Sequence, residues 1–200
     1  MSKLTRYIVL GIAVCMLLAV GIYGVYSATR VEYTLSGSIS YEVGDFEATF
    51  NFTHISGAEN ANEEPLSEGD SLLSNATVDG TVESTGNLTL NQTLYFTNSS
   101  QDKVNDIIIA LNVKHEMPYS VRVTVSPGTA FSSGGSYRGL VTCQASTNQS
   151  SWGNDASIVV AGNQTEGTTI YIKFSSTIQN LQNLPATNTG SLVNVLLESV

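Results

Sequence analysis

The chain has 200 residues, only 12% of them charged, and a formal net charge of −9. Ser, Thr, Asn and Gly are abundant, so we expect a surface of neutral hydrogen-bonding groups, as is common in secreted β-proteins. The charge balance excludes nucleic acid as a partner, because too few cations are present to neutralise a row of phosphates. The length suits a single domain of ordinary size.

The first 28 residues are predicted to be an export segment. Lys3 and Arg6 precede an uncharged apolar stretch at residues 7–26, the arrangement of a signal sequence. The stretch is also long enough to span a bilayer as a helix. Two interpretations therefore stand: a signal peptide cleaved near Ser27 or Ala28, or a retained membrane anchor. Either way the domain is expected outside the cell, with membrane contact only through this segment before cleavage.

The segment that follows, residues 29–43, alternates with period two and is predicted to be a β-strand. Gly37 interrupts it as a bulge, a kink or a point of close backbone approach. Gly44 and Asp45 form a turn signal, and alternation resumes over residues 46–52, which predicts a hairpin. One face of the first strand carries Val31, Tyr33, Leu35, Gly37, Ile39, Tyr41 and Val43.

The remainder, residues 44–200, is predicted to be one all-β domain. Residues 56–86 are polar and acidic and are expected to form a long loop with at most a short strand near residues 76–82. No sustained helical period follows residue 28. Many short strands in one domain predict a β-sandwich of Greek-key or immunoglobulin-like type. The predicted strands lie near residues 88–96, 107–113, 121–125, 140–145, 157–161, 168–174 and 192–197.

The two cysteines are not expected to form a disulfide. Cys15 lies inside the export segment, whereas Cys143 lies in the domain, so cleavage or the membrane would separate them. Cys143 is therefore predicted to be a lone buried thiol that packs as a small apolar residue.

No residue pattern points to catalysis, a metal or a cofactor. His54 and His115 lack the spacing of a metal pair or a triad, and they are expected to be satisfied strand or surface residues. The acidic loop lacks the alternate positions of a calcium loop. Residues 132–136 do not match a nucleophile elbow. Trp152 is expected to pack at the core or rim, although stacking on a sugar is the alternative.

The N-glycosylation acceptor pattern N-x-[ST] occurs seven times, more often than chance predicts for this composition. N-glycans are therefore expected partners, while the alternative is that these are ordinary surface asparagines. The acceptor residues are Asn51, Asn75, Asn87, Asn91, Asn98, Asn148 and Asn163.

An amphipathic strand at the start of the exported chain can complete the sheet of a neighbouring copy. Main-chain hydrogen bonds would supply affinity and pockets would take alternate side chains. Because donor and acceptor surfaces differ, the contact is head-to-tail and generates a filament. Alternatively, the strand stays in its own sheet, or residues 29–36 are donated and 38–43 kept. The candidate donor residues are Val31, Tyr33, Leu35, Gly37 and Ile39.

The string from Ala28 to Tyr41, ATRVEYTLSGSISY, with the preceding signal and the many acceptor asparagines, resembles the glycosylated pilins of archaeal thread filaments. This resemblance implies a β-sandwich subunit whose N-terminal strand, through Val31, Tyr33 and Leu35, inserts into the next subunit at the cell surface. It also implies glycans on the acceptor asparagines. The competing hypotheses are a membrane-anchored extracellular binding domain and, behind it, an extracellular hydrolase or sugar-binding enzyme.

Overall fold

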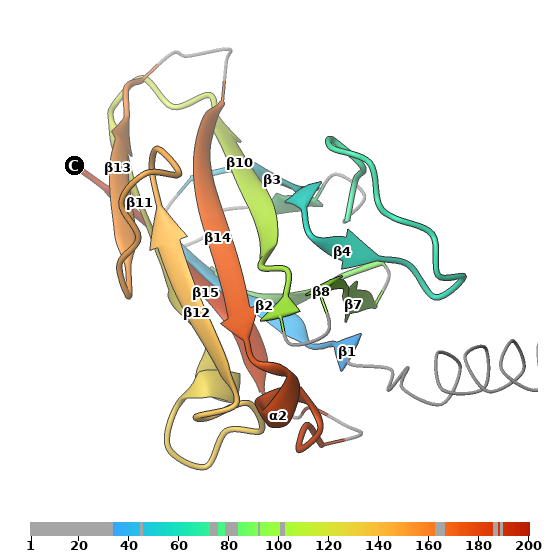
Figure 1. Cartoon of the computed structure of the whole chain (residues 1–200). Helices are drawn as coiled ribbons and strands as arrows, with labels where there is room; N and C mark the ends of the chain where they lie inside the picture. The colour runs from blue at the N-terminus through green and yellow to red at the C-terminus, as the bar shows by residue number, and fades with distance from the viewer. Residues whose placement is uncertain are drawn as a thin grey trace, which may run out of the picture. The chain divides into compact units, whose positions relative to one another are not determined.

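The computed structural model describes residues 34–44, 46–72, 76–78, 84–91, 93–100, 103–162, 167–185, 188 and 190–200. They form two five-stranded sheets that pack face to face (Figure 1). The front sheet has the order β12-β14-β10-β3-β5 and the back sheet β13-β11-β15-β2-β6. The front strands are β12 (Val141–Ser146), β14 (Thr168–Ser176), β10 (Ile107–His115), β3 (Ala48–Ser56) and β5 (Ala76–Val78). The back strands are β13 (Ala156–Val160), β11 (Val121–Pro127), β15 (Ser191–Ser199), β2 (Ser38–Val43) and β6 (Ser84–Thr89).

Smaller elements flank the two sheets. A three-stranded sheet has the order β1-β7-β4 and a two-stranded sheet joins β8 to β9. Among the pairings of the described residues, β15 with β2 is parallel and the others are antiparallel. The prediction of an all-β sandwich is thus confirmed at that level. The small elements are β1 (Thr34–Leu35), β4 (Ala58–Glu59), β7 (Leu94–Phe96), β8 (Asn98–Ser100), β9 (Lys103–Val104), the short helix α2 (Ile178–Leu181) and a 3₁₀ turn at Thr129–Phe131.

The core lies between the two sheets because alternate residues of each strand face inward. In β11, for example, Val121, Val123 and Val125 are buried while Arg122 is exposed. The aromatic side chains Phe52 and Phe174, from β3 and β14, are fully buried. The strands expected near residues 107–113, 121–125, 140–145, 157–161, 168–174 and 192–197 are all present.

The predicted hairpin between the first two long strands is wrong. β2 belongs to the back sheet and β3 to the front sheet, so the chain crosses between sheets after Val43. Phe46 is buried within the crossing, and the Gly44 amide donates to the Leu197 carbonyl at 3.1 Å. Alternation reports which side of a strand faces the core, and the two facing sheets share that core. A hairpin and a crossing therefore leave the same pattern.

The single strand expected over residues 88–96 is also divided. Its first part is β6 in the back sheet and its last part is β7 in the three-stranded sheet, with buried Leu90 between them. The range 56–86, expected to be a loop with at most one short strand, carries two short strands, β4 and β5, and β6 begins within it at Ser84. Helix α2 spans four residues and is capped by the Thr177 hydroxyl, which accepts from the Asn180 amide. It is too short to show a helical period in the sequence.

Candidate functional site

The N-terminal strands lie in two different sheets of their own chain. β1 pairs with β7, with Leu35 opposite Leu94, and Leu35 is 0% exposed. β2 lies between β15 and β6, and its Ile39 is buried in the core. The chain therefore changes sheets between Leu35 and Ser38. Of the candidate donor residues, Val31 and Tyr33 lie outside the described residues.

Ser36, at this change of sheet, is held by side chains distant in sequence. The Tyr137 hydroxyl accepts from the Ser36 amide and donates to the Ser36 carbonyl, each at 3.1 Å. The side-chain amide of Asn188 also donates to the Ser36 carbonyl, with Nδ2 at 2.8 Å. Tyr137 is itself buried. We call Tyr137 and Asn188 the Ser36 clamp; together they satisfy both backbone groups of a residue between two strands.

Gly37 follows the clamp at a point of close approach. Its φ is +157°, and a Cβ there would lie 2.7 Å from Asn188 Nδ2 and 2.8 Å from Leu192 Cγ. Close approach fits these contacts, although the two nearest atoms belong to side chains, and a kink fits the change of sheet between β1 and β2. Any larger residue would displace Asn188 from Ser36, so Gly37 and the clamp depend on each other.

Removing the Tyr137 hydroxyl should loosen the N-terminal strand from the domain. Tyr137→Phe keeps the ring but leaves the Ser36 amide without its partner, so we expect a loss of about 1–3 kcal/mol in the free energy of unfolding. Urea unfolding and proteolysis at residues 34–37 measure the two effects. Tyr171→Phe in β14 is the control. If Tyr137→Phe leaves both the urea midpoint and the protease resistance unchanged, the Tyr137 hydroxyl contributes nothing to holding the N-terminal strand.

Neither residue of the Ser36 clamp was predictable from the sequence. Tyr137 lies in a Ser- and Gly-rich turn between Gly135 and Gly139, and a single large aromatic residue in such a segment is its only signal. Asn188 has no signal in the sequence, because it is one of many asparagines. Both residues act through the backbone of Ser36, which no side-chain pattern can reveal.

The predicted glycan acceptors occupy different environments. Asn87 in β6, Asn91 and Asn148 are exposed, whereas Asn51 is half-buried in β3. The side-chain amide of Asn91 donates to the Ser71 carbonyl, with Nδ2 at 3.3 Å. Asn148 Oδ1 accepts from the amides of Ser150 and Ser151 at 2.9 and 3.1 Å. Asn75 and Asn163 lie outside the described residues, as does the side chain of Asn98.

The two histidines are buried and lie apart in the fold. His54 Nδ1 lies 3.1 Å from the Ser67 carbonyl and its Nε2 accepts from the Ala58 amide at 3.3 Å, so His54 ties β3 to the following loop as a satisfied strand residue. His115 Nε2 lies 3.4 Å from the Val160 carbonyl, and its Nδ1 is buried without a partner. His115 is thus only partly satisfied.

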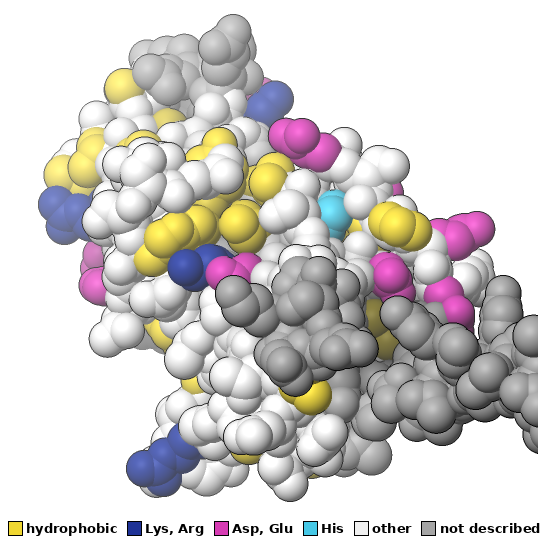
Figure 2. Space-filling model, viewed as in Figure 1, with side chains coloured by type: hydrophobic (Ala, Val, Ile, Leu, Met, Phe, Trp, Pro, Cys, Tyr) yellow, Lys and Arg dark blue, Asp and Glu magenta, His cyan; other side chains and the backbone are white. Residues whose placement is uncertain are grey.

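The described part of the chain holds no group of three or more His, Cys, Asp or Glu side chains arranged to hold a metal ion. Acidic side chains gather where β4 and its neighbouring loop lie, facing solvent (Figure 2). Trp152 is half-buried at the rim, with Lys173 Nζ 4.7 Å from its ring centroid. None of the helices in the described ranges has the length and apolar character needed to cross a membrane.

Cys143 in β12 is buried, as predicted, and is a free thiol. Desolvation by burial raises its pKa to about 12. The thiolate, which is the reactive form, is therefore suppressed in the folded protein. Cys143 acts as a packing residue.

The described residues thus define a two-sheet β-sandwich whose N-terminal strands are held by β7, β15 and the Ser36 clamp. No family model matches the chain, and neither does any curated protein or solved structure.

Proposed function

We propose that the chain is a structural subunit of an extracellular filament, in which residues 29–36 enter the neighbouring subunit while β2 stays in its own. The proposal includes a Greek-key sandwich, a helical export segment at residues 1–28 that is cleaved, and glycans on exposed acceptor asparagines. It needs no catalytic group and no cofactor.

The change of sheet at Gly37 is the observation that carries the proposal. Residues 34–36 contact the domain as an extended segment, with β7 on one side and the Ser36 clamp beyond it. The same segment of another copy could make the same contacts. Exchanging this segment between copies therefore replaces each contact within a chain by an identical contact between chains, and the balance depends mainly on the local concentration of subunits and on the hinge. Gly37 lies where that hinge is needed.

β2 is less suited to exchange than β1. It has six residues, pairs along its length with β15 and β6, and buries Ile39 and Val43. β1 has two residues and pairs with β7. Releasing β2 would open the back sheet and expose the core, whereas releasing β1 uncovers mainly the site of Leu35. This difference supports donation of residues 29–36 alone.

Deleting residues 29–36 should leave a secreted and folded chain that forms no filaments, as judged by electron microscopy and circular dichroism. Leu35→Asp should do the same, because it would place a carboxylate in a fully buried apolar site. Thr34→Asp, at the half-buried neighbouring position, is the matched control and should still assemble. Normal filaments from the deleted chain would contradict the proposal.

A second candidate is a membrane-anchored extracellular binding domain. The burial of Leu35 and Ile39 by their own chain favours it, since it needs no exchange between copies. The mass of the native N-terminus separates the two candidates. A chain that retains Met1 or Ser2 supports the anchor, and one that begins near Ala28 or Thr29 supports the filament.

A further inference from the structure

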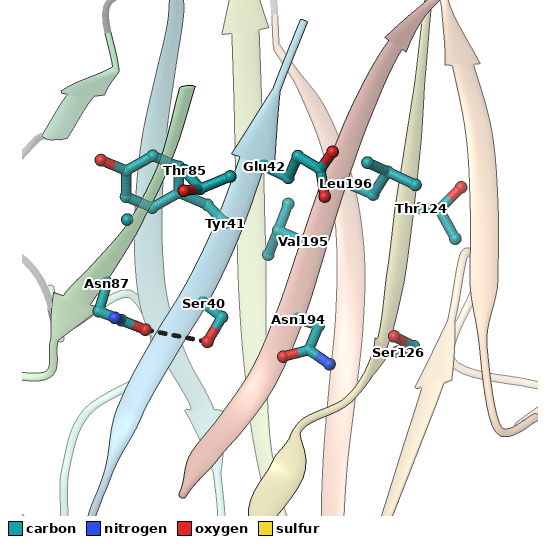
Figure 3. A pocket seen from close by; sticks show the side chains of 11 residues that line it. Ser40, Tyr41, Glu42, Thr85, Asn87, Thr124, Ser126, Asn194, Val195 and Leu196 are labelled. Atoms are coloured by element: carbon teal, nitrogen blue, oxygen red, sulfur yellow. Dashed lines mark hydrogen bonds between the residues drawn. The ribbon is translucent and has the colours of Figure 1, made fainter. Parts of the chain in front are cut away.

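The outer face of the back sheet carries a shallow groove of about 630 Å³ (Figure 3). It runs across β6, β2, β15 and β11. The strand register aligns eight of its 11 lining residues in two rows, with Gly86, Tyr41 and Val195 between them. One row comprises Asn87, Ser40, Asn194 and Ser126, and the other comprises Thr85, Glu42, Leu196 and Thr124.

Neutral groups that both donate and accept hydrogen bonds dominate this lining. Hydroxyls and carboxamides make up the whole of the first row and half of the second, and Glu42 supplies the only charge among the lining residues. An anionic ligand would meet a carboxylate without a lining cation to offset it. A fully apolar ligand would leave the hydroxyls and amides unpaired, at a cost in free energy.

Several of these polar groups are already oriented. The Ser40 hydroxyl donates to Asn87 Oδ1 at 2.9 Å, which directs the Asn87 amide group away from Ser40. The Ser191 hydroxyl donates to Asn194 Oδ1 at 3.0 Å. Among the described residues, neither Asn87 Nδ2 nor the Ser126 hydroxyl has a hydrogen-bonding partner. Asn87 Nδ2 is therefore held in place and remains able to donate to a ligand, which lowers the entropic cost of binding at this position. Asn194 and Thr124 are already engaged, because Asn194 Nδ2 donates to the Pro127 carbonyl at 3.4 Å and the Thr124 hydroxyl lies 3.1 Å from that of Ser157.

An extended peptide is a poor match for this surface. Beneath the groove, β11, β15 and β2 pair with neighbours on both sides, so their backbone groups are already used. β6 is the edge strand among the described residues, but a peptide added to it would extend the sheet beside the groove and would not lie across the lining residues. A hydroxyl-rich neutral ligand matches the lining groups, and Leu196 offers an apolar surface to its C–H groups.

We propose that this groove binds a neutral glycan chain. Two sources share this chemistry: a glycan attached to Asn87, which lines the groove and lies in the acceptor sequence Asn87-Leu88-Thr89, or a glycan carried by another molecule. The proposal does not depend on filament assembly, because neither β1 nor the Ser36 clamp contributes to the groove.

Titration of the full chain with mannotetraose, maltotetraose and chitotetraose, followed by calorimetry, tests the proposal. Three forms are compared: the native chain, Thr89→Ala, which removes the acceptor sequence but keeps Asn87, and Thr89→Ala with Ser126→Leu. Saturable binding by the native chain indicates a glycan from another molecule. Binding that appears only in Thr89→Ala indicates that the chain's own glycan fills the groove.

In either case, Ser126→Leu should weaken binding at least tenfold, because it removes a hydroxyl and fills the groove. Ser175→Leu on β14 of the front sheet is the matched control and should bind like its parent. Circular dichroism verifies that each variant is folded. If none of the three tetrasaccharides binds to the folded Thr89→Ala chain, or if Ser175→Leu weakens binding as much as Ser126→Leu, the proposal is wrong.

Discussion

A chain carrying Gly57→Ala should lose at least about 3 kcal/mol in its free energy of unfolding. Gly57 links β3 to β4 with φ +86°, a left-handed conformation that costs an alanine about 1–2 kcal/mol. A Cβ at Gly57 would in addition overlap the carbonyl group of Asp106, just before β10. This neighbour is backbone rather than a flexible side chain, so relief requires movement between β3 and β10.

Gly69→Ala separates the two causes. Gly69 has a similar φ of +90°, but nothing lies within 4 Å of the position its Cβ would occupy. It should therefore show only the conformational cost. Urea unfolding of both variants provides the comparison. If Gly57→Ala and Gly69→Ala lose the same free energy of unfolding, the overlap with Asp106 is relieved without cost.

Cys143 should make the protein less stable as pH rises above 9. Its pKa is raised from 9.0 to about 12 by burial, so between these values the folded chain keeps a proton that the unfolded chain releases. The contribution of the neutral Cys143 thiol to the free energy of unfolding is complete below pH 9 and is lost progressively as pH rises toward 12. Three pKa units correspond to a loss of at most about 4 kcal/mol, of which about 2 kcal/mol falls by pH 10.5.

Comparison with Cys143→Ala isolates this contribution, because tyrosines and lysines titrate in both chains. At pH 7 the variant should be less stable, owing to the cavity left by the sulfur. In urea unfolding, the difference in free energy of unfolding between Cys143→Ala and the native chain should shrink and then reverse between pH 9 and 10.5. A deficit independent of pH, or rapid reaction of the folded chain with a thiol reagent at pH 8, would contradict the buried neutral thiol.

The strands from β10 onward were predictable because each shows a period-two pattern between clear turn signals. Val121, Val123 and Val125 are buried as their alternation requires. The partners of β2 and β3 were not predictable in this way. The same core accepts side chains from either sheet, so Ile39 and Phe50 give identical signals although their strands lie in opposite layers. Sheet assignment depends on the crossing at Phe46, a long-range property of the fold.

The candidate site was predictable only in part. The alternation pointed to Leu35, Gly37 and Ile39, and the structure brings them together at a change of sheet. The Ser36 clamp was not predictable, because Tyr137 is 101 positions away from Ser36 and binds its backbone. The groove on the back sheet was also missed. It depends on the register of four strands, whereas its Ser, Thr and Asn residues look like ordinary surface residues in the sequence.

Disulfide trapping between β1 and β7 tests the central claim, donation of residues 29–36, most directly. Thr34 and Tyr95 are opposite each other in the register, a pairing whose typical Cα separation suits a disulfide. Thr34→Cys with Tyr95→Cys, in a chain with Cys15 and Cys143 replaced by alanine, would be oxidised in assembled material and run on a non-reducing gel. Exchange between subunits predicts a ladder of covalent oligomers that reducing agent collapses to monomer. Complete oxidation within single chains, with no ladder, would show that β1 stays with its own domain.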